Sequence, residues 1–247
     1  MKKINNAIVI TAIISTFIFV IAIIALTTFA PISKDVVTVD GTSTIKVEPN
    51  LITVYFTIET KGQTSVEAKD ANTLIFNNLT NAITALGFAG NNLTTQSYNI
   101  YPNYYWNNGK QIQDGYIASH SLKIEFSTDQ IDKLDGVLDA GINSGAGISS
   151  INFELTPEAQ NDYKAQALEL ASKDAQAKAD AIAKGFGKIR GELVSVKVSD
   201  FGYVPWNVYA SAGTSSTDAV AAKESVANIQ PSQQEITGRI SATFRLV

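Results

Sequence analysis

The chain has 247 residues, with 19 Lys and Arg, 23 Asp and Glu, and no cysteine. The lack of cysteine excludes disulfides, thiol redox chemistry and thiolate metal sites. Only two charges, Lys2 and Lys3, precede Lys34, so residues 31–247 carry 17 basic against 23 acidic side chains and contain no basic run. This acidic balance disfavours phosphate binding, and we expect no nucleic-acid partner.

Residues 7–30 form an apolar segment of 24 residues without a charge. As a helix it would be about 36 Å long, enough to cross a hydrocarbon layer of ~30 Å. A cleaved signal peptide is the alternative, but its apolar region usually has only ~7 to 15 residues, and Pro31 follows the best cleavage position. We therefore expect residues 1–30 to be a cytoplasmic stub and a single-pass anchor. The preceding lysines place the N-terminus in the cytoplasm and residues 31–247 outside it, in a periplasm or at the cell surface.

Alternating apolar residues predict two opening strands, at 36–47 and 52–59. The Glu-Pro-Asn break at 48–50 would join them as a hairpin. A capping box at Thr64 to Glu67, followed by apolar residues at three- and four-residue spacing, predicts a helix that ends at Gly87.

A second hairpin is predicted around an Asn107-Asn108-Gly109 turn. In its first strand, Tyr101 and Tyr105 should project from a polar face, because side chains alternate between the two faces of a strand. The opposite parity, expected to face the core, comprises Tyr98, Ile100, Tyr104 and Trp106.

The second half of the domain begins with a predicted helix that is capped by Thr128 and ends in the glycine-rich stretch 143–147. A short strand is predicted after it, at 151–155. Pro157 lies in the first turn of the longest predicted helix, and a strand is expected at 194–198. The face of that helix expected to be buried comprises Leu168, Ala171, Ala175, Ala179, Ile182 and Phe186.

Residues 201–230 lose periodicity and predict a long loop, which is longer than a structureless connection usually is. The alternating residues 236–246 predict a last strand that pairs centrally or with the start of the domain. The whole pattern indicates an α+β fold of mostly antiparallel sheets, built from hairpins, with about three helices packed on them after the transmembrane helix.

Three blocks of this sequence resemble the SIMPL-domain family, a domain of unknown function found in periplasmic oxidative-stress and immunogenic proteins. The blocks are VTVDGTSTIKVEPNLITVYFTIET, LTTQSYNIYPNYYWNNGKQIQDGYIASHSLKIEF and DKLDGVLDAGINSGAGISSINFEL. The resemblance implies export, no agreed enzymatic activity, and in some members large ring-like or channel-like oligomers. It also implies a link to envelope or oxidative stress. The apparent permanent anchor departs from relatives that are released into a periplasm.

Catalytic chemistry has few candidates. His120 is the only histidine, and the strand pattern puts it on an apolar face, where a structural role is favoured over a catalytic one. No G-x-S-x-G elbow accompanies it, and no calcium-loop motif is present. The Gly145-Ala146-Gly147 stretch follows a helix and precedes a strand, the reverse of a phosphate loop, and is interpreted as a helix stop. We expect neither a cofactor nor a metal, and no enzyme.

The most unusual feature is aromatic, since six of the 22 aromatic residues lie between Tyr98 and Tyr116. Such a cluster suits protein contacts or sugar stacking, although cross-strand pairing within a hairpin also explains part of it. The candidate interaction surface comprises Tyr101, Tyr105, Trp106, Tyr203 and Trp206. Asn78 and Asn92 begin glycosylation sequons, and Asn92 is the better candidate because it should lie in a turn.

These features predict a membrane-anchored, extracytoplasmic module of the cell envelope. It would assemble with copies of itself as a homo-oligomer or bind an envelope protein or glycan. A receptor for a small molecule or glycan is the alternative. An acid/base pair of carboxylates is not excluded by sequence.

Overall fold

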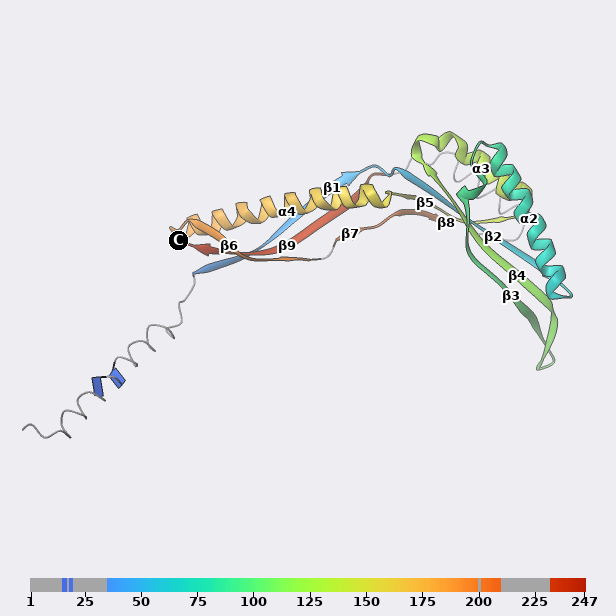
Figure 1. The fold of residues 1–247 in the computed structure, drawn as a ribbon, viewed down its shortest axis with the longest axis horizontal. Coiled ribbons are helices and arrows are strands. Elements are labelled where there is room, and N and C mark those ends of the chain that lie inside the picture. Colours follow the sequence, from blue (N-terminus) through green and yellow to red (C-terminus); the bar gives the residue numbers. More distant parts are fainter. Residues whose placement is uncertain (1–14, 17, 20–34, 200, 210–231) are drawn as a thin grey trace, which may run out of the picture.

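The structure is a computed structural model that describes residues 15–16, 18–19, 35–199, 201–209 and 232–247. The described domain is elongated and consists of two lobes, which we call the arm and the head (Figure 1). The arm contains β1 (Val36–Val47), α4 (Pro157–Gly185), β6 (Arg190–Val198), β7 (Gly202–Tyr203) and β9 (Gln234–Leu246). The head contains β2 (Leu51–Gly62), α2 (Ser65–Ala85), β3 (Leu93–Asn107), β4 (Lys110–Ser127), α3 (Leu134–Ser144), β5 (Gly147–Glu154) and β8 (Trp206–Tyr209).

Each lobe is built on its own antiparallel sheet. The arm sheet has the order β1-β9-β6, with β7 also paired to β9, and the head sheet has the order β3-β4-β2-β5-β8. The prediction that the last strand lies centrally and pairs with the start of the domain is confirmed, because β9 pairs with β1 from Val36↔Arg245 to Val47↔Gln234. The predicted α+β class with antiparallel sheets and three helices is confirmed for the described domain.

The predicted hairpin of the first two strands is wrong, since β1 and β2 belong to different sheets. Residues 48–50 carry the chain from the arm to the head without reversing it. Asn50 is fixed at this junction: its backbone N–H donates to the carbonyl of Glu154 at 3.0 Å, and its side-chain oxygen accepts from the Thr156 N–H at 2.8 Å. These bonds satisfy the backbone where a turn would otherwise do so.

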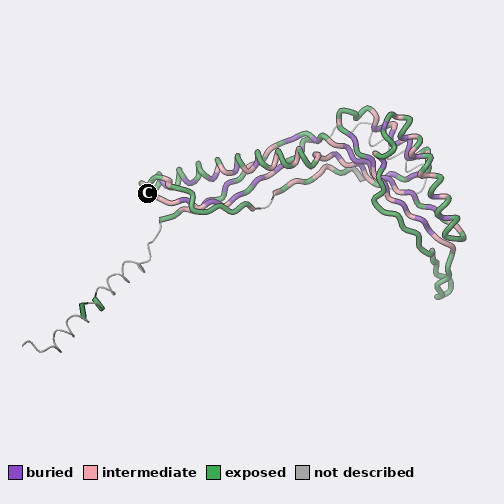
Figure 2. The backbone as a smooth tube through the Cα atoms, in the orientation of Figure 1, coloured by how far each residue is buried: buried purple, intermediate pink, exposed green. Residues whose placement is uncertain are grey.

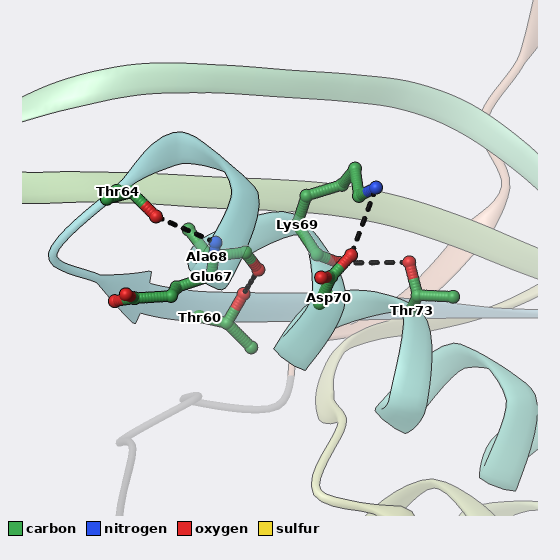
Figure 3. A network of polar contacts seen from close by, with 7 residues as sticks. All are labelled: Thr60, Thr64, Glu67, Ala68, Lys69, Asp70 and Thr73. Atoms are coloured by element: carbon green, nitrogen blue, oxygen red, sulfur yellow. Dashed lines mark hydrogen bonds and ion pairs between the residues drawn. The ribbon is translucent and has the colours of Figure 1, made fainter.

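Two helices, α2 and α3, cover one face of the head sheet, and the largest core of the described residues lies between these helices and the sheet (Figure 2). The predicted cap of α2 is confirmed, because the Thr64 hydroxyl accepts from the Glu67 N–H at 3.2 Å (Figure 3). The Thr60 hydroxyl of β2 donates to the carbonyl of Ala68 at 2.7 Å and ties the first turn to the sheet. The fully buried core side chains include Ile52, Phe56, Ile58, Leu79, Ile83, Leu122, Ile124, Leu138, Ile151 and Phe153.

The second helix of the head starts differently from the prediction. Ser127, rather than Thr128, caps it by accepting from the Asp129 N–H, and a 3-10 segment over Thr128–Lys133 precedes α3. The interpretation of the glycine-rich stretch as a helix stop is confirmed, because Gly145 takes the left-handed conformation at the C-terminus of α3.

In the arm, α4 lies unusually close to the sheet. Its buried face is a stripe of alanines at four-residue spacing, namely Ala167, Ala171, Ala175, Ala179 and Ala183. Gly41 of β1 and Gly238 of β9 lie beneath this stripe. A Cβ at Gly41 would come within 2.0 Å of the Ala171 carbonyl oxygen, so only glycine fits there.

The predicted buried face of this helix was therefore displaced at its C-terminal end. Ile182 and Phe186 are exposed, because the buried stripe keeps its four-residue spacing as far as Ala183. With 3.6 residues per turn, such a stripe winds around the helix axis by about 40° at each step and leaves the predicted face behind. Thr156 caps α4 and Pro157 lies in its first turn, as predicted.

Two other predictions fall partly outside the described residues. The predicted loop at 201–230 contains two short strands, β7 and β8, and residues 210–231 are not described. The predicted transmembrane segment at 7–30 is also outside the described residues, apart from 15–16 and 18–19. Within the described ranges, no helix has the length and apolar character needed to cross a bilayer.

Candidate interaction surface

A two-stranded ribbon projects from the far end of the head (Figure 1). β2 ends at Gly62, which pairs with Tyr116, and beyond this point β3 and β4 pair only with each other. We call residues 101–116 the aromatic ribbon. Its turn has positive φ at Asn108 (49°) and Gly109 (77°), as a two-residue type I′ turn requires. The predicted second hairpin and its turn are confirmed.

The aromatic residues of the ribbon are exposed on both of its faces. Tyr105 pairs with Ile112, whereas the neighbouring pairs, Tyr104 with Gln113 and Trp106 with Gln111, project from the opposite face. The exposed fractions are 44% for Tyr101, 49% for Tyr104, 45% for Tyr105 and 72% for Trp106.

The prediction that Tyr98, Ile100, Tyr104 and Trp106 form part of the core is wrong, because all four are exposed, although Tyr98 and Ile100 pair with the buried His120 and Ala118. The extra residue at the register shift between Pro102 and Tyr104 lies in β4, so the alternation of β3 continues through Tyr104. The position of α2 explains the difference. This helix begins beside the end of β2, so it covers the head sheet but not the ribbon (Figure 1). Nearer the sheet, Tyr98 packs its ring on His120 at 4.9 Å but stays exposed at its outer edge.

The base of the ribbon is fixed by Gly115, which has a φ of 71°. A Cβ at this position would lie 2.2 Å from the Gly62 carbonyl oxygen, so β4 passes the end of β2 in backbone contact. Asn103 adds a cross-strand hydrogen bond from its side-chain amide to the carbonyl oxygen of Asp114 at 3.2 Å. The ribbon therefore leaves the head in a defined direction.

Tyr203 and Trp206, the other two predicted contact residues, make contacts inside the domain. The Tyr203 hydroxyl accepts from the Leu155 N–H at 2.7 Å, and burial raises the pKa of this phenol. The Trp206 ring packs on Phe153 at 5.3 Å. Their rings fasten β7 and β8 to the domain core.

His120 lies inside the head with both ring nitrogens occupied. Its Nδ1 is 3.2 Å from Asn72 Oδ1, and its Nε2 is 2.8 Å from the Thr95 hydroxyl. The Asn72 amide donates to the carbonyls of Ile58 and Ala118, so its oxygen must accept from Nδ1–H. This contact places a proton on Nδ1, and burial lowers the pKa of His120. This is the structural role favoured by the sequence.

The open face of the head sheet, opposite the helices, holds a pocket of about 340 Å³. Its polar lining is uncharged and comes from four strands besides β2: Gln96, Ser121, Ser150, Asn152 and Asn207. Tyr55 of β2 forms one wall, and the pKa of its phenol is raised by burial and then by the nearby Glu154 carboxylate. No sequence motif predicts this site, because its residues are scattered and each occupies an ordinary polar strand position.

A further exposed surface lies on β6, the edge strand of the arm. Val196 and Val198 share a sheet face with their partners Ala242 and Ile240, which α4 covers. The helix packs on β1 and β9 but hardly reaches β6. Both valines are consequently about half exposed.

The two sequons differ in their setting. Asn78 is exposed in the middle of α2, and Asn92 is half-buried at the end of a single 3-10 turn that leads into β3. Among the described residues, no cluster of three His, Asp or Glu side chains could hold a metal ion.

These observations define a class of protein: an elongated α+β domain of two antiparallel sheets that presents an aromatic ribbon at one end. The chain belongs to the SIMPL family, whose model, described as a protein of unknown function (DUF541), matches residues 37–244. The recognition made from the sequence blocks is confirmed.

Named relatives carry no functional description. The chain is 28% identical over 172 residues to the uncharacterized protein YggE of Escherichia coli K12, covering 67% of this chain and 66% of that protein. It is 25% identical over 190 residues to the uncharacterized protein YggE of Edwardsiella ictaluri, covering 75% and 78% respectively. The chain thus spans just under two thirds of the length of the Escherichia coli relative.

Proposed function

We propose that this protein is a membrane-anchored, extracytoplasmic module of the cell envelope that associates with copies of itself through the aromatic ribbon. The 24 uncharged residues at 7–30 support the anchor. The exposed rings of Tyr101, Tyr105 and Trp106 support the contact. An envelope protein or glycan is the alternative occupant of this surface, and no catalytic role is proposed.

The observation that carries this proposal is the aromatic ribbon itself. Tyrosine and tryptophan are enriched at the centres of protein interfaces, where their large rings provide apolar area and their polar tips still form hydrogen bonds. A two-stranded ribbon with exposed rings on both faces can lie against another sheet or ribbon. Since a lone two-stranded hairpin is marginally stable in water, the projecting part gains order from a partner.

The test is the double substitution Tyr105→Ser/Trp106→Ser in the full-length protein, followed by sedimentation in detergent. We expect the assembly to dissociate at least tenfold more readily, with little change in the unfolding temperature because both side chains are outside the core. Phe186→Ser is the control, because this ring is also exposed (78%, against 72% for Trp106) but lies in the arm, away from the ribbon.

Two outcomes would count against the ribbon. If the double variant assembles like the unmodified protein, the ribbon is not the contact. If Val196→Lys on β6 instead abolishes assembly, the contact lies at the edge of the arm sheet. The anchor is tested separately, since a protein held by residues 7–30 stays in the membrane fraction after carbonate washing.

The pocket favours a second candidate function, the binding of a neutral polyhydroxylated ligand such as an envelope sugar. Its hydroxyl and amide groups can donate and accept without charge, and Tyr55 supplies a ring edge and a protonated phenol. Calorimetry with chitobiose should give binding that Tyr55→Ala and Asn152→Ala each weaken at least fivefold. Equal heats for all three proteins would remove this candidate.

A further inference from the structure

The end of the arm, opposite the aromatic ribbon, gathers three exposed apolar side chains. Phe186 is 78% exposed and Ile189 is 72% exposed in the turn between α4 and β6, and Val36 at the start of β1 is 44% exposed. We call these three residues the end patch. A Phe and an Ile that are both more than 70% exposed in one tight turn are unusual for a surface that faces only water, and they suggest an apolar neighbour.

Backbone and ionic contacts bring this turn to the point where the chain enters the arm. The Leu246 N–H donates to the Asp35 carbonyl at 2.8 Å, and the Ile189 N–H donates to the Val247 carbonyl at 2.8 Å. The Lys188 ammonium forms an ion pair with the Asp35 carboxylate. The patch is therefore fixed next to Asp35, the first residue of the described domain.

The length of chain before Asp35 limits how far this end can lie from a membrane. The apolar segment 7–30 ends at Ala30, only five Cα-to-Cα steps before Asp35. Fully extended, five steps span at most about 18 Å. Since the headgroup layer itself is roughly 5 to 7 Å thick on each side, Asp35 lies at or near the bilayer surface if residues 7–30 span it.

We infer that the end patch docks into the interface of the same bilayer, with Phe186 and Ile189 among the headgroups. The occupant is a lipid surface, and the inference rests on the anchor of the proposed function. Lys184 lies beside the turn, and its charge suits an anionic headgroup layer.

Docking at this end also sets the orientation of the molecule. The 29-residue α4 runs along the arm and would be about 44 Å long as a regular helix. With the arm's end at the membrane, the head lies beyond this length, and the aromatic ribbon lies at the far end of the head (Figure 1). The ribbon would then be presented away from the bilayer.

The absence of cysteine permits a direct test in the full-length protein. Single variants Ile189→Cys and Phe186→Cys are labelled with bimane and reconstituted in vesicles of phosphatidylethanolamine and phosphatidylglycerol at 3:1. Asn78→Cys, exposed in the middle of α2 and outside both the ribbon and the end patch, is the control. Because positions 186 and 189 are exposed, neither substitution disturbs the core, and one serves as a check on the other.

We expect a nitroxide attached to the lipid headgroup to quench the labels at 186 and 189 at least twofold, and to leave the label at 78 unquenched. Iodide in the aqueous phase should quench the label at 78 at least threefold more than the other two. If the protein floats with vesicles after a carbonate wash but all three labels respond to iodide alike, docking is refuted and the anchor stands. If the protein does not float with the vesicles, both proposals fail.

Discussion

The close approach of α4 to the arm sheet can be tested by replacing Gly41 with alanine. The new Cβ would lie 2.0 Å from the Ala171 carbonyl oxygen and 2.8 Å from the Ala175 Cβ. An ordinary carbon-to-oxygen contact is more than 1 Å longer, and the obstructing atom belongs to the helix backbone, so no side-chain rotation relieves the clash. The whole helix must move away from β1 and β9.

Overpacking of this kind usually costs 1 to 3 kcal/mol, and we expect about 3 kcal/mol here because the helix must lift along several alanine contacts. For a domain of this size that corresponds to a decrease in the unfolding temperature of about 6 to 12 °C. The assay is thermal unfolding of the full-length protein in detergent, monitored by circular dichroism.

Gly185→Ala is the matched control, since it makes the same chemical change near the end of the same helix, where no atom lies within 4 Å of the added Cβ. This variant should be neutral or slightly stabilising, because alanine favours the helix. Equal unfolding temperatures for the two variants would refute the argument that the glycine sets the distance between helix and sheet.

Three further predictions concern the head. Asn72→Ala should destabilise the fold by about 3 kcal/mol in thermal unfolding, because the buried carbonyls of Ile58 and Ala118 lose their donors; a loss below 1 kcal/mol would contradict this reading. Burial lowers the pKa of His120 in the folded protein below its ordinary 6.5, so the unfolded chain takes up a proton first as the pH falls below 6.5. The free energy of unfolding should therefore decrease there by up to about 1.4 kcal/mol per pH unit. The variant His120→Gln should lose this slope when unfolding is measured from pH 7.5 to 5. Tyr104→Ser should change the free energy of unfolding by no more than about 0.5 kcal/mol, because the Tyr104 ring is outside the core. A loss of several kcal/mol would instead show that Tyr104 is a core residue, as strand parity predicts.

Local signals in the sequence predicted individual elements well. The caps at Thr64 and Thr156, the turn at Asn108 and Gly109, and the stop at Gly145 each satisfy backbone groups or backbone angles within a few residues. Such requirements depend only on neighbours in the chain and can be recognised without the fold.

The errors arose where distant parts of the chain decide the outcome. The assignment of β1 and β2 to one hairpin failed because β1 finds its partner in β9, which sequence adjacency does not indicate. The burial of Tyr104 was predicted from parity alone, which could not reveal the point where α2 stops covering the strands. The pocket beside Tyr55 was missed for the same reason, since five strands must first be placed side by side.

The pairing of β1 with β9 has a consequence for how the protein is made. β1 leaves the ribosome first, yet its partners lie about 190 residues later, which at 5 to 20 residues per second is a delay of roughly 10 to 40 s. Strands β2 to β5 of the head can pair without this delay, because they lie in one continuous stretch of the chain, residues 51–154. The head can thus form while β1 remains an unpaired strand, open to pairing with another chain. A nascent protein released before β9 is made would carry a folded head on an arm that has no sheet.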